Sequence, residues 1–408
     1  MKDRLVFKIL RMALAVVTLG VTGLTIQYYT SESYMTLNGD SKVTIGLNGL
    51  YDDPGVTACL HGMDASDEVV TSGEVDTETP GVYTLEYRAG NFVVQREVEV
   101  LDVMDPVIEL KGDETISMKL GEEFEDPGFT ATDSKGNDLT DQVKVKNADV
   151  TRAGKCRIAY SVVDAEGKGT RIYRNLNVEP NTEYKTCGIP ICMYHYVYDE
   201  NNIPAKVNAN WISKEDLAEE LAWLNEHEYY FPTWQEVRDY VDGKLLLPEK
   251  SIVLTFDDGS KSFLENGIPV LEEYNVPATS FVITSKDGEK KVQQYQSDLI
   301  NYQSHSDNLH RGGGNVGHGG IMTVISHDEG VADLKKSAEI VGSNDAFAYP
   351  FGDTNENTHQ IVEDAGFKCA VTTTQGRVKP GSDPLLLPRQ RMSRNQSMDS
   401  FRAMVLPY

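Results

Sequence analysis

Two kinds of hydrophobic pattern divide the chain. In its first half, short stretches such as 82–87 and 155–160 alternate apolar with polar positions and are separated by Gly, Pro, Asp and Asn turns. Alternation with a period of two predicts half-buried strands, and frequent turns between short strands are typical of an antiparallel β-sandwich. We therefore expect an all-β region first and a different architecture after it.

From Cys187 onwards, continuous apolar runs alternate with amphipathic segments. We expect buried strands at the short apolar runs, which are 189–193, 251–255, 279–283 and 346–349. Helical spacing predicts helices at 213–226, 333–341 and 358–365. Ser213 is of a residue type that caps helices. Strands that alternate with helices predict a parallel sheet in a β/α fold.

The all-β region contains an internal repeat with a period of 73 residues. The sequence DPGxTA occurs at 53–58 and again at 126–131. We expect two copies of one small sandwich, at 34–102 and 103–180, which resemble bacterial immunoglobulin-like surface modules. Such copies act either as a spacer or as a carbohydrate- or wall-binding unit, and the sequence leaves both readings open.

The N-terminus has the pattern of a membrane anchor. Four basic residues lie between positions 2 and 11, and 12–26 carry no charge. The bulky Tyr28 and Tyr29 follow instead of a small-residue cleavage site. We expect residues 1–30 to form a cytoplasmic basic flank and an uncleaved signal-anchor helix. The predicted location is the cell membrane, single-pass, with the C-terminal domains extracellular.

Charge and cysteine content narrow the possible partners. The chain has 408 residues and a net charge of −25. Nucleic acid is therefore not expected as a partner, because phosphate binding needs clustered Lys and Arg. Five scattered cysteines are too few for a disulfide scaffold. Cys187 and Cys192 are close enough to pair, but buried free thiols are an equal alternative.

Adjacent carboxylates mark the end of one predicted strand. The sequence TFDDG at 255–259 completes an apolar run, so Asp257 and Asp258 are expected at its C-terminal end, where the Gly lets the chain turn away. His305 and His310 follow later in the chain. One Asp and two His are typical first ligands of a catalytic Zn²⁺-like ion, and the second Asp is then free to act as a base.

These motifs, together with YPFG at 349–352 and PICMYH at 190–195, resemble a known family. They are similar to the polysaccharide deacetylases of carbohydrate esterase family 4, the NodB-homology domain. The resemblance covers 187–408 and is closest to the branch that acts on poly-N-acetylglucosamine. It implies a distorted, incomplete (β/α) barrel with its site at the C-terminal ends of the strands.

The resemblance also implies roles for individual residues. It makes Asp257 the general base, and it makes Asp258, His305 and His310 the ligands of the metal. The metal is expected to be Zn²⁺, with Co²⁺ or Ni²⁺ as alternatives. Because five residues turn a helix through about 500°, His305 and His310 can converge only on an irregular backbone, such as a loop or a π-type bulge.

Further roles fall on the YPFG turn and the first strand. The backbone N–H of Phe351 is expected to stabilise the oxyanion of the reaction. Tyr349 and Pro350 of the same turn are expected to contact substrate. His195 is expected either to contact substrate or to be packed in the core.

Two family features are absent from this sequence. Ala348 stands where most members have an Arg that orients the base, and Arg389 or Arg391, after the expected strand 385–387, is our candidate replacement. Extended chain would point both arginines to the same side. No His follows His359, so the late histidine acid of the family is missing and the general acid is unassigned.

The prediction is therefore a metal-dependent hydrolase anchored in the membrane. It would remove N-acetyl groups from N-acetylglucosamine units of an extracellular polysaccharide of the peptidoglycan or poly-N-acetylglucosamine type. One alternative is an O-acetyl polysaccharide esterase of the same fold. Another is a catalytically weak glycan-binding surface protein, which the two missing features favour and the complete Asp and His set opposes.

Overall fold

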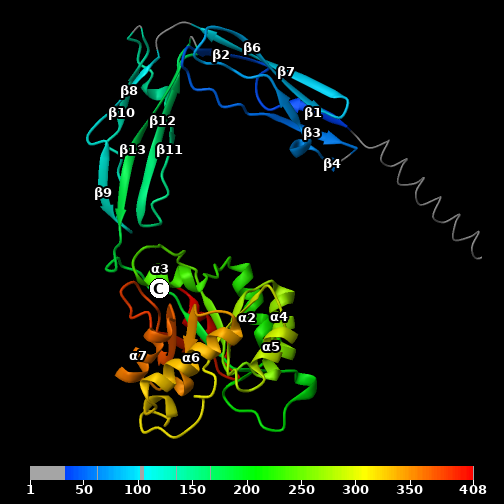
Figure 1. The fold of residues 1–408 in the computed structure, drawn as a ribbon, viewed down its shortest axis with the longest axis vertical. Helices are drawn as coiled ribbons and strands as arrows, with labels where there is room; N and C mark the ends of the chain where they lie inside the picture. Colours follow the sequence, from blue (N-terminus) through cyan, green and yellow to red (C-terminus); the bar gives the residue numbers. More distant parts are fainter. Residues whose placement is uncertain (1–32, 62, 102–104, 135, 166, 408) are drawn as a thin grey trace, which may run out of the picture. The chain divides into compact units, whose positions relative to one another are not determined.

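A computed structural model describes most of the chain. The described ranges are 33–61, 63–101, 105–134, 136–165 and 167–407. The predicted signal-anchor helix lies outside them. Among the described helices, none combines the length and apolar character that crossing a membrane requires. The chain divides into two compact units, one with the first repeat and most of the second, the other with the remainder of the second repeat and the C-terminal region (Figure 1).

The first repeat consists of two β-sheets. One sheet has the order β1-β3-β4, with bounds Tyr34–Leu37, Val56–Leu60 and Met63–Asp64. The other has the order β2-β7-β6-β5, with bounds Lys42–Gly46, Phe92–Leu101, Gly81–Ala89 and Val70–Ser72. Apolar side chains of both sheets, among them Met35, Ala58 and Leu85, share one core. The predicted alternating strand at 82–87 is thus confirmed as part of β6.

The second repeat has the same two-sheet plan. A small sheet pairs β8 (Val107–Leu110) with β10 (Phe129–Thr132). The larger sheet has the order β11-β12-β13-β9, with bounds Lys144–Lys146, Gly154–Val163, Gly169–Glu179 and Thr115–Lys119. The rings of Phe129 and Tyr160 meet with centroids 5.1 Å apart, which brings the two sheets together.

The repeated DPGxTA motif has a structural cause. In the first repeat, the Asp53 carboxylate accepts a hydrogen bond of 2.6 Å from buried Tyr87 and pairs with buried Arg96. In the second, Asp126 accepts from Tyr160 at 2.5 Å and lies 3.4 Å from Arg174. A buried guanidinium must be paired, so each copy keeps the same Asp, Tyr and Arg. Asp53 and Tyr87 precede their counterparts by 73 residues, and Arg96 precedes Arg174 by 78. The repeats can therefore be aligned on the Tyr for one strand and on the Arg for the next.

The C-terminal region is a closed parallel barrel. Its strands, in barrel order, are β14 (Ile191–Tyr194), β17 (Val253–Phe256), β18 (Ala278–Val282), β19 (Ile300–Ser304), β20 (Ala346–Ala348), β21 (Cys369–Gln375) and β22 (Leu387–Arg391). The expectation of a (β/α) barrel is confirmed. The barrel is incomplete in having seven strands in the described region instead of eight, but its ring is closed, because β22 pairs with β14.

Helices and short strands connect the barrel strands, and one helix follows the last strand. The helices are α2 (Lys214–Glu226), α3 (Trp234–Val241), α4 (Ile268–Tyr274), α5 (Gly288–Gln294), α6 (His327–Val341), α7 (Glu356–Ala365) and α8 (Met398–Val405). The Ser213 hydroxyl accepts from the Asp216 N–H at 3.0 Å, so the predicted cap of α2 is confirmed. The helix predicted from residue 333 begins at His327, because Ser326 caps it earlier.

The barrel wall buries a thiol, as one alternative predicted, and a carboxyl group that the sequence did not mark as buried. Cys192 is buried in β14, and no disulfide joins it to Cys187. Glu220 of α2 is 4% exposed and accepts a hydrogen bond of 2.7 Å from the Tyr194 hydroxyl. Burial raises the pKa of the Glu220 carboxyl to about 8.

Replacing Glu220 with Gln is expected to flatten the dependence of stability on pH. The folded chain keeps a proton on Glu220 that the unfolded chain, with an ordinary pKa of about 4.3, releases. The free energy of unfolding should therefore fall as the pH rises from about 4.3 to about 8. A glutamine does not titrate, so the variant should be more stable by about 1–3 kcal/mol at the upper end of this window. Urea unfolding at both ends tests this, and identical pH slopes would contradict it.

Candidate active site

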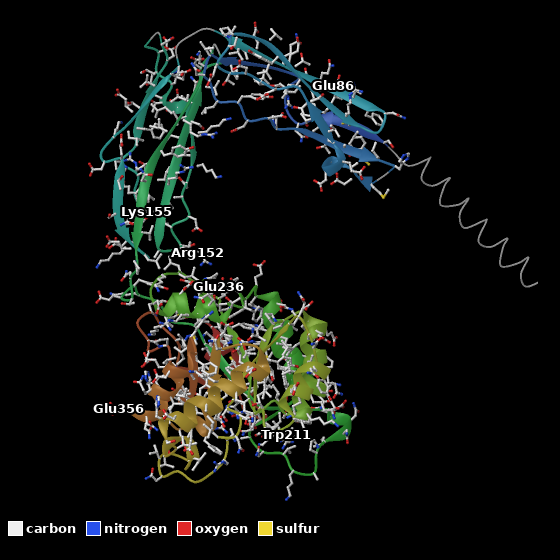
Figure 2. The ribbon with its side chains drawn as sticks, viewed as in Figure 1. Glu86, Arg152, Lys155, Trp211, Glu236 and Glu356 are labelled. Carbon is white, nitrogen blue, oxygen red and sulfur yellow. The ribbon has the colours of Figure 1, made fainter. Side chains whose placement is uncertain are left out.

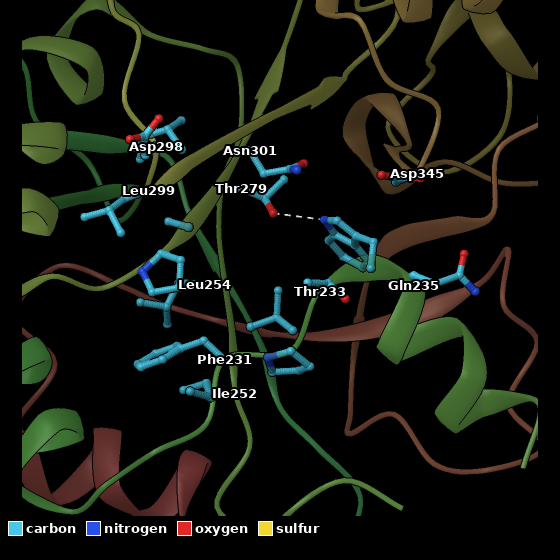
Figure 3. A pocket seen from close by; sticks show the side chains of 16 residues that line it. Phe231, Thr233, Gln235, Ile252, Leu254, Thr279, Asp298, Leu299, Asn301 and Asp345 are labelled. Atoms are coloured by element: carbon cyan, nitrogen blue, oxygen red, sulfur yellow. Dashed lines mark hydrogen bonds between the residues drawn. The ribbon is translucent and has the colours of Figure 1, made fainter. Parts of the chain in front are cut away.

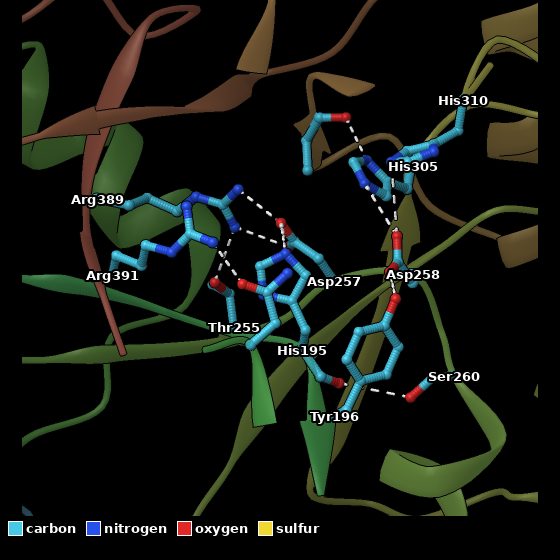
Figure 4. A network of polar contacts seen from close by, with 12 residues as sticks. His195, Tyr196, Thr255, Asp257, Asp258, Ser260, His305, His310, Arg389 and Arg391 are labelled. Atoms are coloured by element: carbon cyan, nitrogen blue, oxygen red, sulfur yellow. Dashed lines mark hydrogen bonds and ion pairs between the residues drawn. The ribbon is translucent and has the colours of Figure 1, made fainter. Parts of the chain in front are cut away.

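Every predicted polar site residue lies at one end of the barrel. Asp257 and Asp258 follow β17, His305 follows β19, and Arg389 and Arg391 belong to β22 (Figure 4). Because the strands are parallel, their C-terminal ends meet at the same rim. A pocket of about 310 Å³ opens there, and its walls include both aspartates and both predicted histidine ligands.

A different pocket lies at the opposite ends of the strands (Figure 3). Its volume is about 380 Å³, and its walls include Ile252, Ala278 and Ile300, which stand at or next to the starts of β17, β18 and β19. Trp234 donates a hydrogen bond of 2.9 Å to Thr279 inside it. No His lines this pocket. Its titratable residues are Asp298 and Asp345, whereas the C-terminal rim combines carboxylates with histidines and is therefore the site of chemistry.

Asp258, His305 and His310 form a compact cluster. The Nε2 atoms of His305 and His310 lie 3.7 and 3.5 Å from the Asp258 Oδ1 atom. One ligand atom from each residue lies within 4.8 Å of the other two. Two imidazoles and a carboxylate at such spacing suit a Zn²⁺-like ion with positions left for water and substrate. The donor set therefore fits the expected metal.

Both imidazoles of the cluster are in the form that binds metal. His305 donates through Nδ1 to the Ala348 carbonyl oxygen at 2.7 Å, which leaves Nε2 with a lone pair directed to the cluster. Burial lowers the pKa of His305. Burial and the neighbouring His305 lower the pKa of His310 to about 4. At neutral pH both rings are uncharged and can act as ligands.

An irregular loop brings the two histidines together, as their spacing requires. Ser306, directly after His305, has a φ of 71°, so the chain leaves strand geometry there. The Asp333 carboxylate then accepts hydrogen bonds of 2.8 Å from the N–H groups of Asp307 and Asn308. As a result, the rings of His305 and His310 lie with centroids 4.7 Å apart. The predicted departure from regular helix is confirmed.

Three residues of this site other than Gly have left-handed backbone. Besides Ser306, Asp258 has a φ of 71° and Phe351 a φ of 61°. Such conformations cost about 1–3 kcal/mol in residues other than Gly and persist where the surroundings enforce them. Gly352, next to Phe351, has a φ of 74°, and a Cβ there would meet Thr373 Oγ1 at 2.1 Å. The YPFG turn is therefore held in one shape.

Asp257 is held apart from the cluster by Arg389. The two Nη atoms of Arg389 donate to the two carboxylate oxygens of Asp257, each at 2.7 Å (Figure 4). Asp257 is 3% exposed and Arg389 is 1% exposed. Burial alone would raise the pKa of Asp257, but the charge and hydrogen bonds of Arg389 outweigh it and hold that pKa below its ordinary range. Asp257 is thus an oriented, ionised carboxylate.

The two candidate arginines have different surroundings. Both side chains lie on the site's side of β22, as alternation predicted. Arg391 is exposed, lines the pocket and pairs with the side chain of Asn210 rather than with Asp257. Arg389 additionally donates to the carbonyl oxygen of Thr372 at 2.8 Å. Only Arg389 therefore contacts Asp257 in the way expected of the family's base-orienting arginine, whose position is occupied here by Ala348.

The remaining predicted residues are distributed around the pocket. His195 lines it, with Nε2 4.0 Å from Asp257 Oδ2, and its buried Nδ1 has no hydrogen-bond partner among the described residues. Burial lowers the pKa of His195, against the attraction of the two aspartates. Tyr349 and Phe351 also line the pocket. Pro350 is buried and is not part of the pocket wall.

Tyr196 is a site residue that the sequence reasoning missed. Its hydroxyl donates to Asp258 Oδ2 at 2.5 Å, which leaves Oδ1 facing the two histidines. It lies in β15 (Tyr196–Tyr198), which pairs with β16 (Trp211–Ser213). Its position directly after the predicted pocket residue His195 was the available signal, but the pairing that positions it is not local.

Replacing Tyr196 with Phe is expected to weaken metal binding by about 10–100-fold, because Asp258 loses the partner that fixes its orientation. Activity at saturating metal should change much less. Calorimetric titration with Zn²⁺ measures the first quantity and acetate release the second. Tyr198→Phe in the same strand is the matched control, and equal metal affinities in both variants would contradict this role.

Comparison with known proteins defines the domains. Residues 245–370 match the family model described as "Polysaccharide deacetylase", and residues 35–100 and 108–178 match "Bacterial surface protein, Ig-like domain". The chain therefore contains a polysaccharide deacetylase domain behind two bacterial surface Ig-like domains. The resemblance predicted from the motifs is confirmed in both parts.

Individual relatives agree with this assignment. A poly-beta-1,6-N-acetyl-D-glucosamine N-deacetylase of Staphylococcus aureus (strain MSSA476) is 26% identical over 197 residues, which is 44% of this chain. The chain spans 66% of the length of that relative. The protein of the same name from Staphylococcus epidermidis is 26% identical over 213 residues, 48% of this chain and 71% of the relative.

Solved structures of deacetylases are also similar. The Streptococcus pyogenes deacetylase PplD in complex with acetate is 26% identical, with a TM-score of 0.48, over 55% of this chain and 100% of that one. IcaB from Ammonifex degensii is 23% identical, with a TM-score of 0.44, over 54% of this chain and 98% of that one.

Proposed function

We propose that this chain is a metal-dependent polysaccharide N-deacetylase acting on N-acetylglucosamine units of an extracellular polymer. The observation that carries the proposal is the cluster of Asp258, His305 and His310 beside a separately held carboxylate, Asp257. The deacetylase family match supports the reaction. The names of the staphylococcal relatives support N-acetylglucosamine as the sugar of the substrate.

Asp258, His305 and His310 would hold the divalent ion, with Zn²⁺ as our first choice and Co²⁺ or Ni²⁺ as alternatives. When bound, such an ion lowers the pKa of a water molecule and polarises a carbonyl group. The protein's part is to keep both imidazoles neutral and to fix their orientation. The bonds from His305 to Ala348 and from Tyr196 to Asp258 support this role.

The other residues would handle protons and charge. Asp257 accepts the proton of the attacking water, because Arg389 keeps it ionised and oriented toward the pocket. The backbone N–H of Phe351 donates to the acetyl oxygen as negative charge develops there. The leaving amine needs a proton, and the proton that Asp257 takes from the water would reach it through His195, which lines the pocket with its Nε2 4.0 Å from Asp257.

Acetate release by the full chain tests the proposal. The substrates are peptidoglycan, poly-N-acetylglucosamine and acetylxylan, each with and without added Zn²⁺ or Co²⁺. We expect metal-dependent release from at least one of the two N-acetylated polymers. Release from acetylxylan alone would instead identify an O-acetyl esterase of the same fold. Binding to the polymers without any release would identify a glycan-binding surface protein.

We further propose that residues 1–30 anchor the enzyme in the cell membrane, with the following domains outside. The basic flank and the uncharged run that follows it support this location. The full-length protein should fractionate with membranes and be removed from intact cells by added protease. Recovery from the medium with a new N-terminus near about residue 30, the expected end of the apolar run, would show a cleaved signal peptide instead.

A further inference from the structure

The second Ig-like domain carries a cationic surface in an otherwise acidic chain. Lys144 and Lys146 lie on β11, Arg157 on β12 and Arg171 on β13, and all four are exposed. They border a hollow of about 450 Å³ on one face of the sheet. The whole chain has a net charge of −25, so four cations around one hollow depart strongly from its average surface.

The strand geometry places these side chains on the outer face of the sheet. Tyr160 of β12 points into the core, and Ala159 and Ser161 on either side of it point outward. Lys146 pairs directly with Ala159 and Lys144 with Ser161, so both lysines share this outer face. On β13, Arg171 and Tyr173 alternate with the buried Arg174 in the same way.

The hollow also contains an aromatic platform. The guanidinium of Arg157 lies over the ring of Tyr173, 4.0 Å from its centroid. An exposed ring held by a cation offers a flat apolar surface beside positive charge. Asp52, the only carboxylate among the lining residues, is mostly exposed and pairs with Arg171 at 3.0 Å. The lysines and Arg157 therefore have no carboxylate beside them in the wall of the hollow.

The first repeat shows that the fold does not require this charge. Counted from the buried Tyr of each copy, Glu86 corresponds to Ala159 and Thr84 to Arg157. Counted from the buried Arg, Gln95 corresponds to Tyr173. Figure 2 labels Glu86 of β6 in the first copy and Lys155 of β12 in the second.

The cations of the first copy are neutralised by acids. Lys42 pairs with Glu97 at 2.8 Å, and Arg88 pairs with Glu86 at 2.5 Å. The two copies therefore share their buried polar core and differ in the sign of the same outer face. The difference in charge therefore affects which partner that face can bind and not how the domain folds.

We propose that the outer face of the second Ig-like domain binds an anionic polysaccharide. Lys144, Lys146, Arg157 and Arg171 would neutralise phosphate or carboxylate groups along the polymer, and Tyr173 would stack against a sugar ring. The domain would then hold the chain on an acidic wall polymer, in addition to acting as a spacer. This binding does not depend on the proposed deacetylase activity, and its test uses no reaction.

Binding of the full-length chain to three polysaccharides that differ in charge tests the proposal. The probes are phosphorylated dextran, polygalacturonate and neutral dextran, measured by surface plasmon resonance at low and high NaCl. We expect binding to at least one charged polymer, at least about 10-fold weaker at high salt, and none to neutral dextran. The two charged arms distinguish phosphate from carboxylate. Absence of binding to both would overturn the proposal.

Two double variants that each remove two exposed cations give a matched comparison. Lys144→Gln with Lys146→Gln should weaken binding to the charged polymer by about 10-fold or more. Lys42→Gln with Arg88→Gln, on the corresponding face of the first repeat, should change it by less than about 2-fold. Equal losses in the two variants would show that only net charge matters and would overturn the site.

A substitution of Tyr173 tests the sugar contact separately. Tyr173→Ser should weaken polysaccharide binding by about 3-fold or more without changing the melting temperature, because stacking on the ring is lost. Wild-type polymer binding in that variant would remove the sugar contact.

Two other outcomes would replace the proposal. Binding to vesicles with anionic phospholipid but not to the polymers would indicate a membrane surface. Self-association that is lost in the Lys144 and Lys146 variant, without polymer binding, would indicate a second copy of the chain.

Discussion

Asp257→Asn is expected to lower acetate release by about 10²–10⁴-fold while the protein still binds one divalent ion per chain. An asparagine keeps the shape of the side chain but cannot accept the proton of the attacking water. Asp257 contributes no atom to the cluster of Asp258 and the two histidines. Initial rates and metal content of the same purified preparations measure the two quantities.

The neighbouring residue provides the control for this prediction. Asp258→Asn changes the same functional group one residue away, but Asp258 Oδ1 lies within 3.7 Å of the Nε2 atoms of both histidines. This variant should lose metal and activity together. If Asp257→Asn loses as much metal as Asp258→Asn, both carboxylates hold the ion and the separate roles are wrong.

The parts of the fold that the sequence predicted depend on local patterns. A buried strand is visible in the apolar run before Asp257, and the cap of α2 is visible in Ser213, because both are decided by neighbouring residues. The duplicated sandwich was predictable because the DPGxTA motif recurs after 73 residues, at 53–58 and 126–131. Closure of the barrel was not, because it depends on pairing between β14 and β22, which are far apart in the chain.

The site divides in the same way. Asp257, Asp258, His305 and His310 were identified because their residue types and order carry the chemistry. Tyr196 was missed, because its contact with Asp258 needs a turn after β14 that no local pattern reveals. For the same reason, the sequence could not separate Arg389 from Arg391, which share a strand and a side.

The structure separates these two arginines by what each guanidinium contacts. Arg389 is enclosed and makes two parallel hydrogen bonds to Asp257, whereas Arg391 stands at the open rim beside Asn210. Two parallel bonds fix both the position and the plane of a carboxylate, which a single bond does not. Arg389 therefore supplies from β22 the contact that the family takes from the position of Ala348.

Arg389→Lys is accordingly expected to lower kcat by about 10-fold or more with metal content unchanged, because an ammonium cannot reproduce the two parallel bonds. Arg391→Lys is the matched control, and its kcat should stay within about 2-fold of the wild type, since its guanidinium pairs at the exposed rim. Any effect of Arg391→Lys should appear in KM, because this residue lines the pocket. Equal kcat losses in the two variants would mean that Asp257 is oriented by something other than Arg389.

Removing the guanidinium altogether should affect stability as well as rate. Arg389→Met leaves the buried Asp257 carboxylate without a cation, which costs about 3–5 kcal/mol for a buried pair. In the wild type the pKa of Asp257 is depressed, so the stability from this pair is present above the ordinary Asp pKa of about 3.9 and is lost as the pH falls below it. The wild type and Arg389→Met should therefore differ most in urea unfolding at neutral pH and converge in acid. A difference in the free energy of unfolding that is the same at both pH values would show that Arg389 stabilises the barrel by packing and not through the charge of Asp257.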